Sequence, residues 1–264
     1  MSINFHAYQC RGYLLSDYEE IEKQWKTLFA NYAPERDIRI LNLKRDEQYL
    51  YIRYFQTLYR LHLKNGTLER QLAQSPTPKP SSTGHSSANT SSYVKVQSKD
   101  KLYLNPVNTN TLSVEGWTTK VYFNEAMAIY HLLHYVKDHA YQSGIWIPNT
   151  ELDTRSHRNN QREDLLFASF TRQFSGKLDK LSAACRKLNG TPLQTRADVA
   201  YQFSVFPQVS LQLLFWDADE DFPAQVQILV DKRITDYVHL ETTGCMVSDL
   251  FEQLTAALTP EQNQ

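Results

Sequence analysis

The stretch VAYQFSVFPQVSLQLLFWDADEDFPAQVQILVD, residues 199–231, decides the fold. Apolar side chains occupy every second position in three successive runs, residues 199–205, 209–215 and 224–230. Such an alternation is typical of a β-strand with one buried face and one exposed face. The last two runs flank an acidic turn at residues 217–221, which predicts a hairpin and hence an antiparallel sheet.

Helical periodicity dominates the chain on both sides of these strands. Residues 124–141 and 164–188 each place their apolar side chains on one face, and a last helix ends before Pro260. Gly176 is expected to break or bend the second of these helices, because glycine is a poor helix former. Strands beside amphipathic helices predict an α+β fold, in which a mainly antiparallel sheet packs against several helices.

The N-terminal part repeats this combination on a smaller scale. A helix begins after Ser16 and carries its apolar side chains at helical spacing. These side chains are Tyr18, Ile21, Trp25, Leu28 and Phe29. Three runs follow, IRILNL at 38–43, YLYIRYF at 49–55 and TLYRLHL at 57–63, and they predict a meander of short antiparallel strands.

A change in composition divides the chain. Residues 75–92, SPTPKPSSTGHSSANTSS, are almost all small or polar, and such a segment cannot bury enough apolar surface to offset the entropy lost on ordering. We interpret it as a flexible linker or a long loop. It separates an N-terminal unit, residues 1–74, from a main α+β domain, residues 93–264, or it interrupts a single domain; both alternatives stay open.

Composition and charge exclude several classes of protein. The 264 residues carry a formal net charge of -1, so no overall field attracts nucleic acid or an anionic membrane. The three cysteines, Cys10, Cys185 and Cys245, form no CxxC pair, so we expect no self-contained zinc or iron-sulphur motif and leave any cofactor unknown. No segment reaches the ~20 apolar residues of a membrane span, and no secretory signal is evident. We therefore expect a cytoplasmic protein that binds neither nucleic acid nor membranes.

The C-terminal half resembles a bacterial and archaeal family known only as a domain of unknown function. The resemblance rests on HLLHYV and GIWIP, on an aromatic helix FASFTRQF, on VFPQV, and on FWDADEDFPAQVQILVD, with its tryptophan, acidic pair and Phe-Pro. It extends over about residues 121–258. Members of that family often occur beside iron-sulphur or corrinoid-linked one-carbon proteins. The resemblance therefore implies a fold and a metabolic neighbourhood, without a mechanism.

The acidic turn is the first candidate site. Asp217, Asp219, Glu220 and Asp221 could converge on a hard cation such as Ca²⁺ or Mg²⁺. The DxDxD pattern also opens an EF-hand loop, but Phe222 stands where that loop needs glycine. We favour a solvated hairpin tip whose charges discourage pairing with another strand.

Two histidines on one helix are the second candidate. His131 and His134 are three residues apart, and Asp138 follows His134 by four, so a metal pair or a His-Asp proton shuttle is geometrically available. No partner motif supplies a third metal ligand. We favour a partly buried helix flank with one hydrogen bond between a histidine and the aspartate.

Basic residues of the predicted meander are the third candidate. Arg53, Arg60 and His62 could lie on one face of the sheet together with Tyr51 and bind an anion. The ordinary polar face of an antiparallel sheet is the favoured alternative. The run RSHRNNQRED, residues 155–164, could also clamp a phosphate, but we interpret it first as an exposed loop.

No catalytic signature appears in the sequence: GxSxG, GxGxxG, HExxH and a phosphate loop are all absent. The function is therefore unknown, and we lean against an enzyme. We expect a non-catalytic accessory protein that binds a small ligand or a protein partner, in one-carbon or cofactor metabolism if the family resemblance applies. The alternative is a metal-dependent enzyme that uses the Asp217/Asp219/Asp221 turn or the His131/His134 helix.

Overall fold

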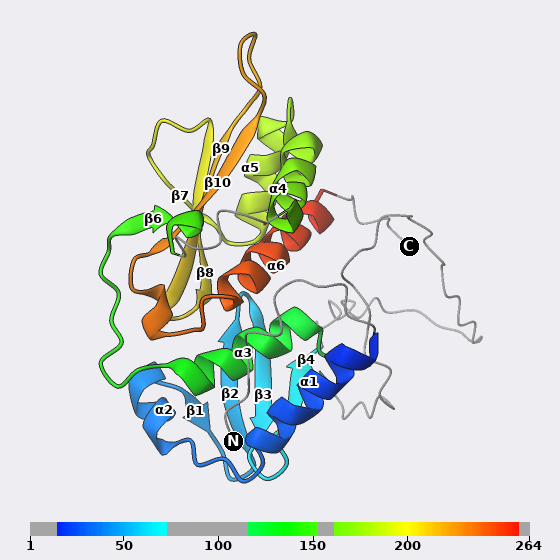
Figure 1. The fold of residues 1–264 in the computed structure, drawn as a ribbon, viewed down its shortest axis with the longest axis vertical. Coiled ribbons are helices and arrows are strands. Elements are labelled where there is room, and N and C mark those ends of the chain that lie inside the picture. Colours follow the sequence, from blue (N-terminus) through cyan, green and yellow to red (C-terminus); the bar gives the residue numbers. More distant parts are fainter. Residues whose placement is uncertain (1–14, 73–115, 153–160, 259–264) are drawn as a thin grey trace, which may run out of the picture.

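The computed structural model describes residues 15–72, 116–152 and 161–258, and the described residues form six α-helices and two five-stranded antiparallel sheets. Figure 1 shows the two sheets one beyond the other along the long axis of the molecule, with helices beside each. The predicted α+β fold is confirmed. Among the described residues, no helix is long and apolar enough to cross a membrane.

The first sheet lies in the half of the molecule that contains the N-terminal helix. Its strands, in spatial order, are β1 (Lys44–Arg45), β2 (Tyr49–Tyr54), β3 (Thr57–His62), β4 (Leu68–Gln71) and β5 (Trp117–Thr118). Helices α1 (Leu15–Leu28) and α3 (Phe123–Tyr135) cover one face of it (Figure 1). The alternation of side chains along β2 decides which face of the sheet is buried. Leu50, Ile52 and Tyr54 point into the core, whereas the residues between them are partly or fully exposed.

One predicted strand is wrong. Residues 38–43 do not begin the meander, because Ile38–Leu41 belong to helix α2 (Glu35–Leu41). Pro34 provides the start of this helix, where its carbonyl accepts the N–H of Ile38 at 2.8 Å, and Glu35 and Asp37 place acids in the first turn. Asn42 ends it in the left-handed conformation with φ 50°. The alternating apolar pattern was too short to distinguish strand from helix.

The second sheet contains the residues 199–231 that were predicted as three strands. In spatial order its strands are β6 (Trp146–Pro148), β10 (Gln225–Asp231), β9 (Val209–Trp216), β8 (Val199–Phe206) and β7 (Thr191–Pro192). The hairpin is confirmed, because Gln225 pairs with Trp216 and Val230 with Leu211. Helices α4 (Gln161–Phe174), α5 (Leu178–Lys187) and α6 (Thr242–Ala256) pack on one side of this sheet (Figure 1).

Glycine controls two of the turns. The predicted break at Gly176 is confirmed: this residue has φ 70° and lies between α4 and α5. Gly66, also at φ 70°, lies so close to α1 that a Cβ would stand 2.2 Å from the carbonyl oxygen of Lys26. Only glycine combines that backbone conformation with so close an approach. The remaining short elements are the 3-10 helices η2 (Asn149–Glu151) and η4 (Ile234–Asp236).

The two sheets share one hydrophobic core. Helix α3 packs against α1 on one side and against α6 on the other, so it belongs to both halves. The backbone N–H of Phe55 donates to the carbonyl of Val205 at 2.6 Å, and the ring of Tyr54 lies 5.1 Å from that of Phe206. These contacts join the end of β2 directly to the end of β8.

Several predictions fall outside the described residues. These are the composition-biased segment 75–92 and most of the loop 155–164, of which residues 161–164 begin α4. The division into residues 1–74, 75–92 and 93–264 stays a prediction.

Candidate functional site

The face of the first sheet opposite α1 and α3 carries the predicted basic residues. Strand register places Tyr49 opposite His62, Tyr51 opposite Arg60, and Arg53 opposite Leu58. All six side chains therefore project to the same face. Arg53 and His62 nevertheless stand at opposite ends of this strand pair, so the face does not bring the three basic residues together.

Arg60 is already engaged. Its guanidinium carbon lies 4.1 Å from the ring centroid of Tyr49 and 4.3 Å from that of Trp117. Its Nε donates to the Glu69 carboxylate at 2.6 Å. Because two aromatic rings and a carboxylate surround the cation, Arg60 serves the sheet surface itself and has little capacity left for an anion. Arg53 is exposed and donates to the carbonyl of Gln56, at 3.3 Å.

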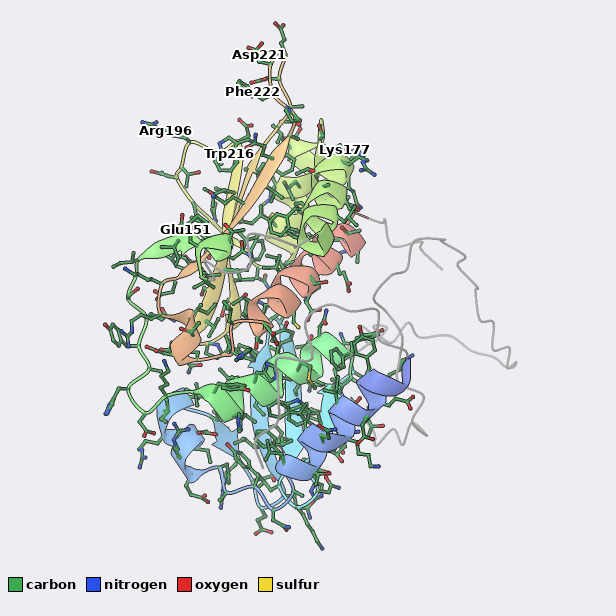
Figure 2. All side chains as sticks on the ribbon, viewed as in Figure 1. Glu151, Lys177, Arg196, Trp216, Asp221 and Phe222 are labelled. Carbon is green, nitrogen blue, oxygen red and sulfur yellow. The ribbon has the colours of Figure 1, made fainter. Side chains whose placement is uncertain are left out.

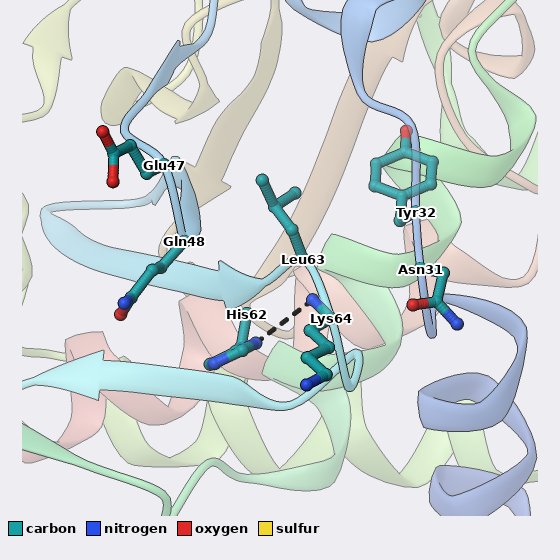
Figure 3. A pocket seen from close by; sticks show the side chains of 7 residues that line it. All are labelled: Asn31, Tyr32, Glu47, Gln48, His62, Leu63 and Lys64. Carbon is teal, nitrogen blue, oxygen red and sulfur yellow. Dashed lines mark hydrogen bonds between the residues drawn. The ribbon is translucent and has the colours of Figure 1, made fainter.

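A pocket of about 460 Å³ opens at the His62 end of this face. Figure 3 shows its side chains arranged around Leu63, with Glu47 and Gln48 on one side, Asn31 and Tyr32 on the other, and His62 and Lys64 along the edge between them. We call this the Leu63 pocket. Five of its seven side chains are charged or carry an amide or imidazole, so it suits a polar ligand.

Backbone hydrogen bonds hold the three segments of the Leu63 pocket together. The N–H of Tyr32 donates to the carbonyl of Leu63 at 3.1 Å, and the N–H of Leu63 donates to the carbonyl of Gln48 at 2.9 Å. Asp46 fixes the neighbouring turn, because its carboxylate accepts the N–H groups of Gln48 and Tyr49 at 2.8 and 2.7 Å. A hydrogen bond from the Tyr51 hydroxyl, and after it these two backbone bonds, lower the pKa of Asp46. The pocket is therefore formed before any ligand arrives.

The His62 imidazole has a fixed tautomer. The backbone N–H of Lys64 donates to its Nδ1 at 3.2 Å (Figure 3). A nitrogen that accepts a hydrogen bond carries no proton, so the neutral ring holds its proton on Nε2. His62 thus offers a hydrogen-bond donor at Nε2, and the Tyr49 ring, 5.0 Å away and edge-on, orients it.

The acidic turn between β9 and β10 does not assemble a cation site from its four acids. Asp217 turns back towards the helices, where its carboxylate accepts the N–H of Gly176 at 2.9 Å. Asp219 accepts the N–H groups of Asp221 and Phe222 at 2.9 and 2.7 Å and so closes the turn on itself. Glu220 and Asp221 are exposed, and Figure 2 shows Asp221 and Phe222 at the far tip of the hairpin.

Asp138 pairs with an arginine and not with the histidines of α3 in the described residues. Arg36 Nε donates to the Asp138 carboxylate at 2.7 Å, so the expected bond between a histidine and Asp138 is absent from the described residues. His131 Nδ1 lies instead 2.6 Å from the hydroxyl of Thr242. Burial, with His239 and His134 nearby, lowers the pKa of His131 to about 3, so the ring is neutral. His134 is exposed on the same helix.

Metal ligands do not converge in the part of the chain that the structure describes. No group of three or more His, Cys, Asp or Glu side chains there could hold a metal ion. The proposed metal sites at the turn and at the helix gain no support from this geometry.

Sequence reasoning missed a buried network between the two halves. Asp249 of α6 accepts the Tyr54 hydroxyl at 2.7 Å and the side-chain amide of Asn124 at 3.0 Å. Glu125, next to Asn124, lies beside Tyr59 and 3.8 Å from Arg70. Burial raises the pKa values of Asp249 and Glu125. The available signal was an acid in an apolar helix, since Val247, Leu250 and Phe251 surround Asp249 in the sequence.

Comparison with known proteins gives a family but no activity. Residues 90–252, more than half of the chain, match a family model described as Domain of unknown function (DUF3786). The chain belongs to the DUF3786 family. No curated protein and no solved structure matches it.

The DUF3786 match divides the candidate sites. Three of the candidate groups lie within the matched residues 90–252. These are the hairpin acids, the histidines of α3, and the buried network of Asn124, Glu125 and Asp249. The Leu63 pocket and the Tyr49–Arg60–Trp117 stack lie largely before them. The family resemblance inferred from the sequence is confirmed, and the DUF3786 description assigns no role to either group.

Proposed function

We propose that this protein is a non-catalytic small-ligand-binding protein and that its ligand occupies the Leu63 pocket. The observation that supports this proposal is a preformed pocket of about 460 Å³ whose walls are held by main-chain hydrogen bonds. That volume lies within the ~300–1,000 Å³ of typical small-molecule sites. A wall that is already ordered lowers the entropic cost of binding.

The chemistry of the lining supports a polar ligand of mixed charge. Lys64 supplies a cation, Glu47 an anion on a different side of Leu63, and His62 a hydrogen-bond donor at Nε2 (Figure 3). A zwitterion such as an α-amino acid could place its carboxylate near Lys64 and His62 and its ammonium near Glu47. Leu63 would contact the apolar part of such a molecule. A role in one-carbon or cofactor metabolism stays a prediction from the family resemblance.

Isothermal titration of the full chain with a panel of α-amino acids tests this proposal. We expect at least one of them to bind, and Lys64→Ala to weaken that binding about tenfold, or about 1.4 kcal/mol, by removing the cation. Lys44→Ala is the matched control, because Lys44 is an exposed lysine on the same sheet outside the pocket.

Two results would contradict the proposal. One is equal binding by wild type, Lys64→Ala and His62→Ala, which would place the ligand elsewhere. The other is no binding by the panel, together with no excess mass over the polypeptide when protein purified from cells is measured by native mass spectrometry.

The metal-dependent enzyme has no comparable support. The carboxylates of Asp217 and Asp219 are taken up by main-chain N–H groups, and Arg36 occupies Asp138.

A further inference from the structure

A second pocket adjoins the Leu63 pocket, because Tyr32 lines both. Its volume is about 230 Å³, and it opens between α1, the start of α2 and the end of α3. We call it the Asp37 pocket, after the only carboxylate among the described residues that line it. Because it is smaller than the ~300 Å³ at the lower end of drug-sized sites, it suits a compact molecule.

One half of the Asp37 pocket is apolar. Phe29 and Leu133 are each only 2% exposed and form its inner wall. Leu28 stands at the rim and is 45% exposed, although its position on the apolar face of the first helix predicted burial. An exposed leucine alone is ordinary, but here it borders a pocket with two buried apolar walls. This half would accept an alkyl chain or an aromatic ring.

The other half is polar: Arg36 and Asp37 line it, and Asp138, outside the lining, shares the Arg36 guanidinium. The buried Asp37 carboxylate accepts the hydroxyl of Tyr32 and the Nη1 of Arg36, the latter at 2.8 Å. The same guanidinium also donates to Asp138, at 2.7 Å, and to the carbonyl of Val136, at 2.6 Å. One cation therefore serves two carboxylates.

The unbalanced charge affects Asp37 directly. Burial raises the pKa of Asp37 to about 6, and the nearby Asp138 adds to the rise. Asp37 is therefore mostly ionised at pH 7.5 in a poorly solvated position. Each carboxylate oxygen has two lone pairs, so Asp37 can accept a further hydrogen bond.

His134 completes the polar half with an acceptor. Among residues 15–72, 116–152 and 161–258 its ring makes no hydrogen bond, and it packs edge-on against Trp25 and Tyr135. Although part of the His134 side chain is exposed, partial desolvation lowers its pKa, so the ring is neutral at pH 7.5 and one nitrogen has a free lone pair. A donor group in the pocket would find this nitrogen available.

We propose that the Asp37 pocket binds a small primary amine with an apolar body. The ammonium group donates to the carboxylate of Asp37 and to the neutral ring of His134, and the apolar body lies against Leu28, Phe29 and Leu133. Charge complementarity selects a cation, because Arg36 leaves one of its two carboxylates uncompensated. The aromatic rings of Phe29 and Tyr32 add a favourable environment for a cation. This site shares Tyr32 with the Leu63 pocket, but its other lining residues and its proposed ligand differ from those of that pocket.

Isothermal titration of the full chain at pH 7.5 with isoamylamine and benzylamine tests this inference. The matched neutral compounds are isoamyl alcohol and benzyl alcohol, which have nearly the same shape. We expect the amines to bind at least tenfold more tightly than the alcohols. Asp37→Asn should weaken amine binding at least tenfold, because the amide keeps the shape and loses the charge. Below pH 6 the wild type should lose this preference as Asp37 becomes protonated.

A steric variant keeps the test decisive if Asp37→Asn fails to fold. Leu28→Trp fills the rim of the Asp37 pocket and should abolish amine binding. Leu72→Trp is its control, because Leu72 is also 45% exposed but lies outside the pocket. The inference is wrong if neither amine binds, if the alcohols bind equally well, or if Leu28→Trp binds the amines as tightly as Leu72→Trp. Variants of Lys64 and His62 should leave amine binding unchanged, so this result is separate from that for the Leu63 pocket.

Discussion

Single residues set the electrostatics of the interior, and Asp249 is the clearest case. It is an acid at 7% exposure on the inner face of α6, where it accepts hydrogen bonds from Tyr54 of β2 and Asn124 of α3. Burial raises its pKa to about 7, and the charges of Glu125 and Glu252 add to the rise. Both hydrogen bonds oppose the shift, but they do not outweigh the loss of hydration.

The pH dependence of stability should therefore change in Asp249→Asn. A carboxyl whose folded pKa lies above its unfolded value stabilises the fold at low pH and loses this contribution as pH rises from about 4 to about 7. Because an amide does not ionise, Asp249→Asn should gain stability relative to wild type between pH 5 and pH 8. At about 1.4 kcal/mol per pH unit over two units, the gain is about 2–3 kcal/mol.

Urea unfolding of both proteins across this pH range measures the difference. Comparison between the two proteins cancels titrating groups that do not interact with Asp249, including His131, whose lowered pKa of about 3 destabilises the wild type as pH falls below 6.5. A constant difference between the two proteins from pH 5 to pH 8 would show that Asp249 keeps an ordinary pKa.

At the level of elements, the acids of the β9–β10 hairpin differ in their contribution to stability. Asp217 joins the hairpin to the turn between α4 and α5, because its carboxylate accepts the N–H of Gly176 at 2.9 Å and the hydroxyl of Ser175 at 3.1 Å. These bonds lower the pKa of Asp217, the bond from Gly176 most strongly. Within the part of the chain that the structure describes, the tip beyond it has no such bond to a helix, and Figure 2 shows it projecting from the molecule.

Asp217→Ala should destabilise the protein by about 1–2 kcal/mol, as expected for the loss of a capping carboxylate. The turn at Gly176 would then lose its acceptor, and amide exchange at residues 176–178 should accelerate. Asp221→Ala is the matched control, since Asp221 is exposed at the tip and should change stability by no more than about 0.5 kcal/mol. Equal effects of the two substitutions, measured by thermal unfolding, would refute this distinction between the acids.

At the scale of the whole molecule, the two sheets depend on common contacts. Helix α3 packs on the first sheet and on α6, and the Phe55 N–H to Val205 carbonyl bond joins the ends of β2 and β8. Asp249 connects α6 to the same end of β2 through Tyr54. Neither sheet keeps all its neighbours if the other unfolds.

We therefore expect a single cooperative unfolding transition. The most protected amides of β3 and of β9 should report the same free energy of opening in native-state hydrogen exchange, because global unfolding exposes both. Denaturation followed by far-UV circular dichroism and by tryptophan fluorescence should give coincident curves. Two separate transitions would mean that the halves are independently stable.

The sequence by itself determined the local patterns. Alternation along residues 199–231 predicted three strands and their hairpin, and Gly176 predicted the break between α4 and α5, because both depend on backbone geometry and on the side chains of neighbouring positions. It also indicated that Arg53, Arg60 and His62 share a sheet face. The pattern failed at residues 38–43, where four apolar positions fit a helical turn as well as a strand.

Only the tertiary structure decided which side chains meet. The Leu63 pocket joins three chain segments, the Asp37 pocket joins residues about 100 positions apart along the chain, and Asp249 meets Tyr54 across 195 positions. The sequence could not exclude a bond between His134 and Asp138, but Arg36 arrives from α2 and takes that carboxylate. Hydrogen bonds and burial depend on distances in space, and periodicity along the chain contains no information on those distances.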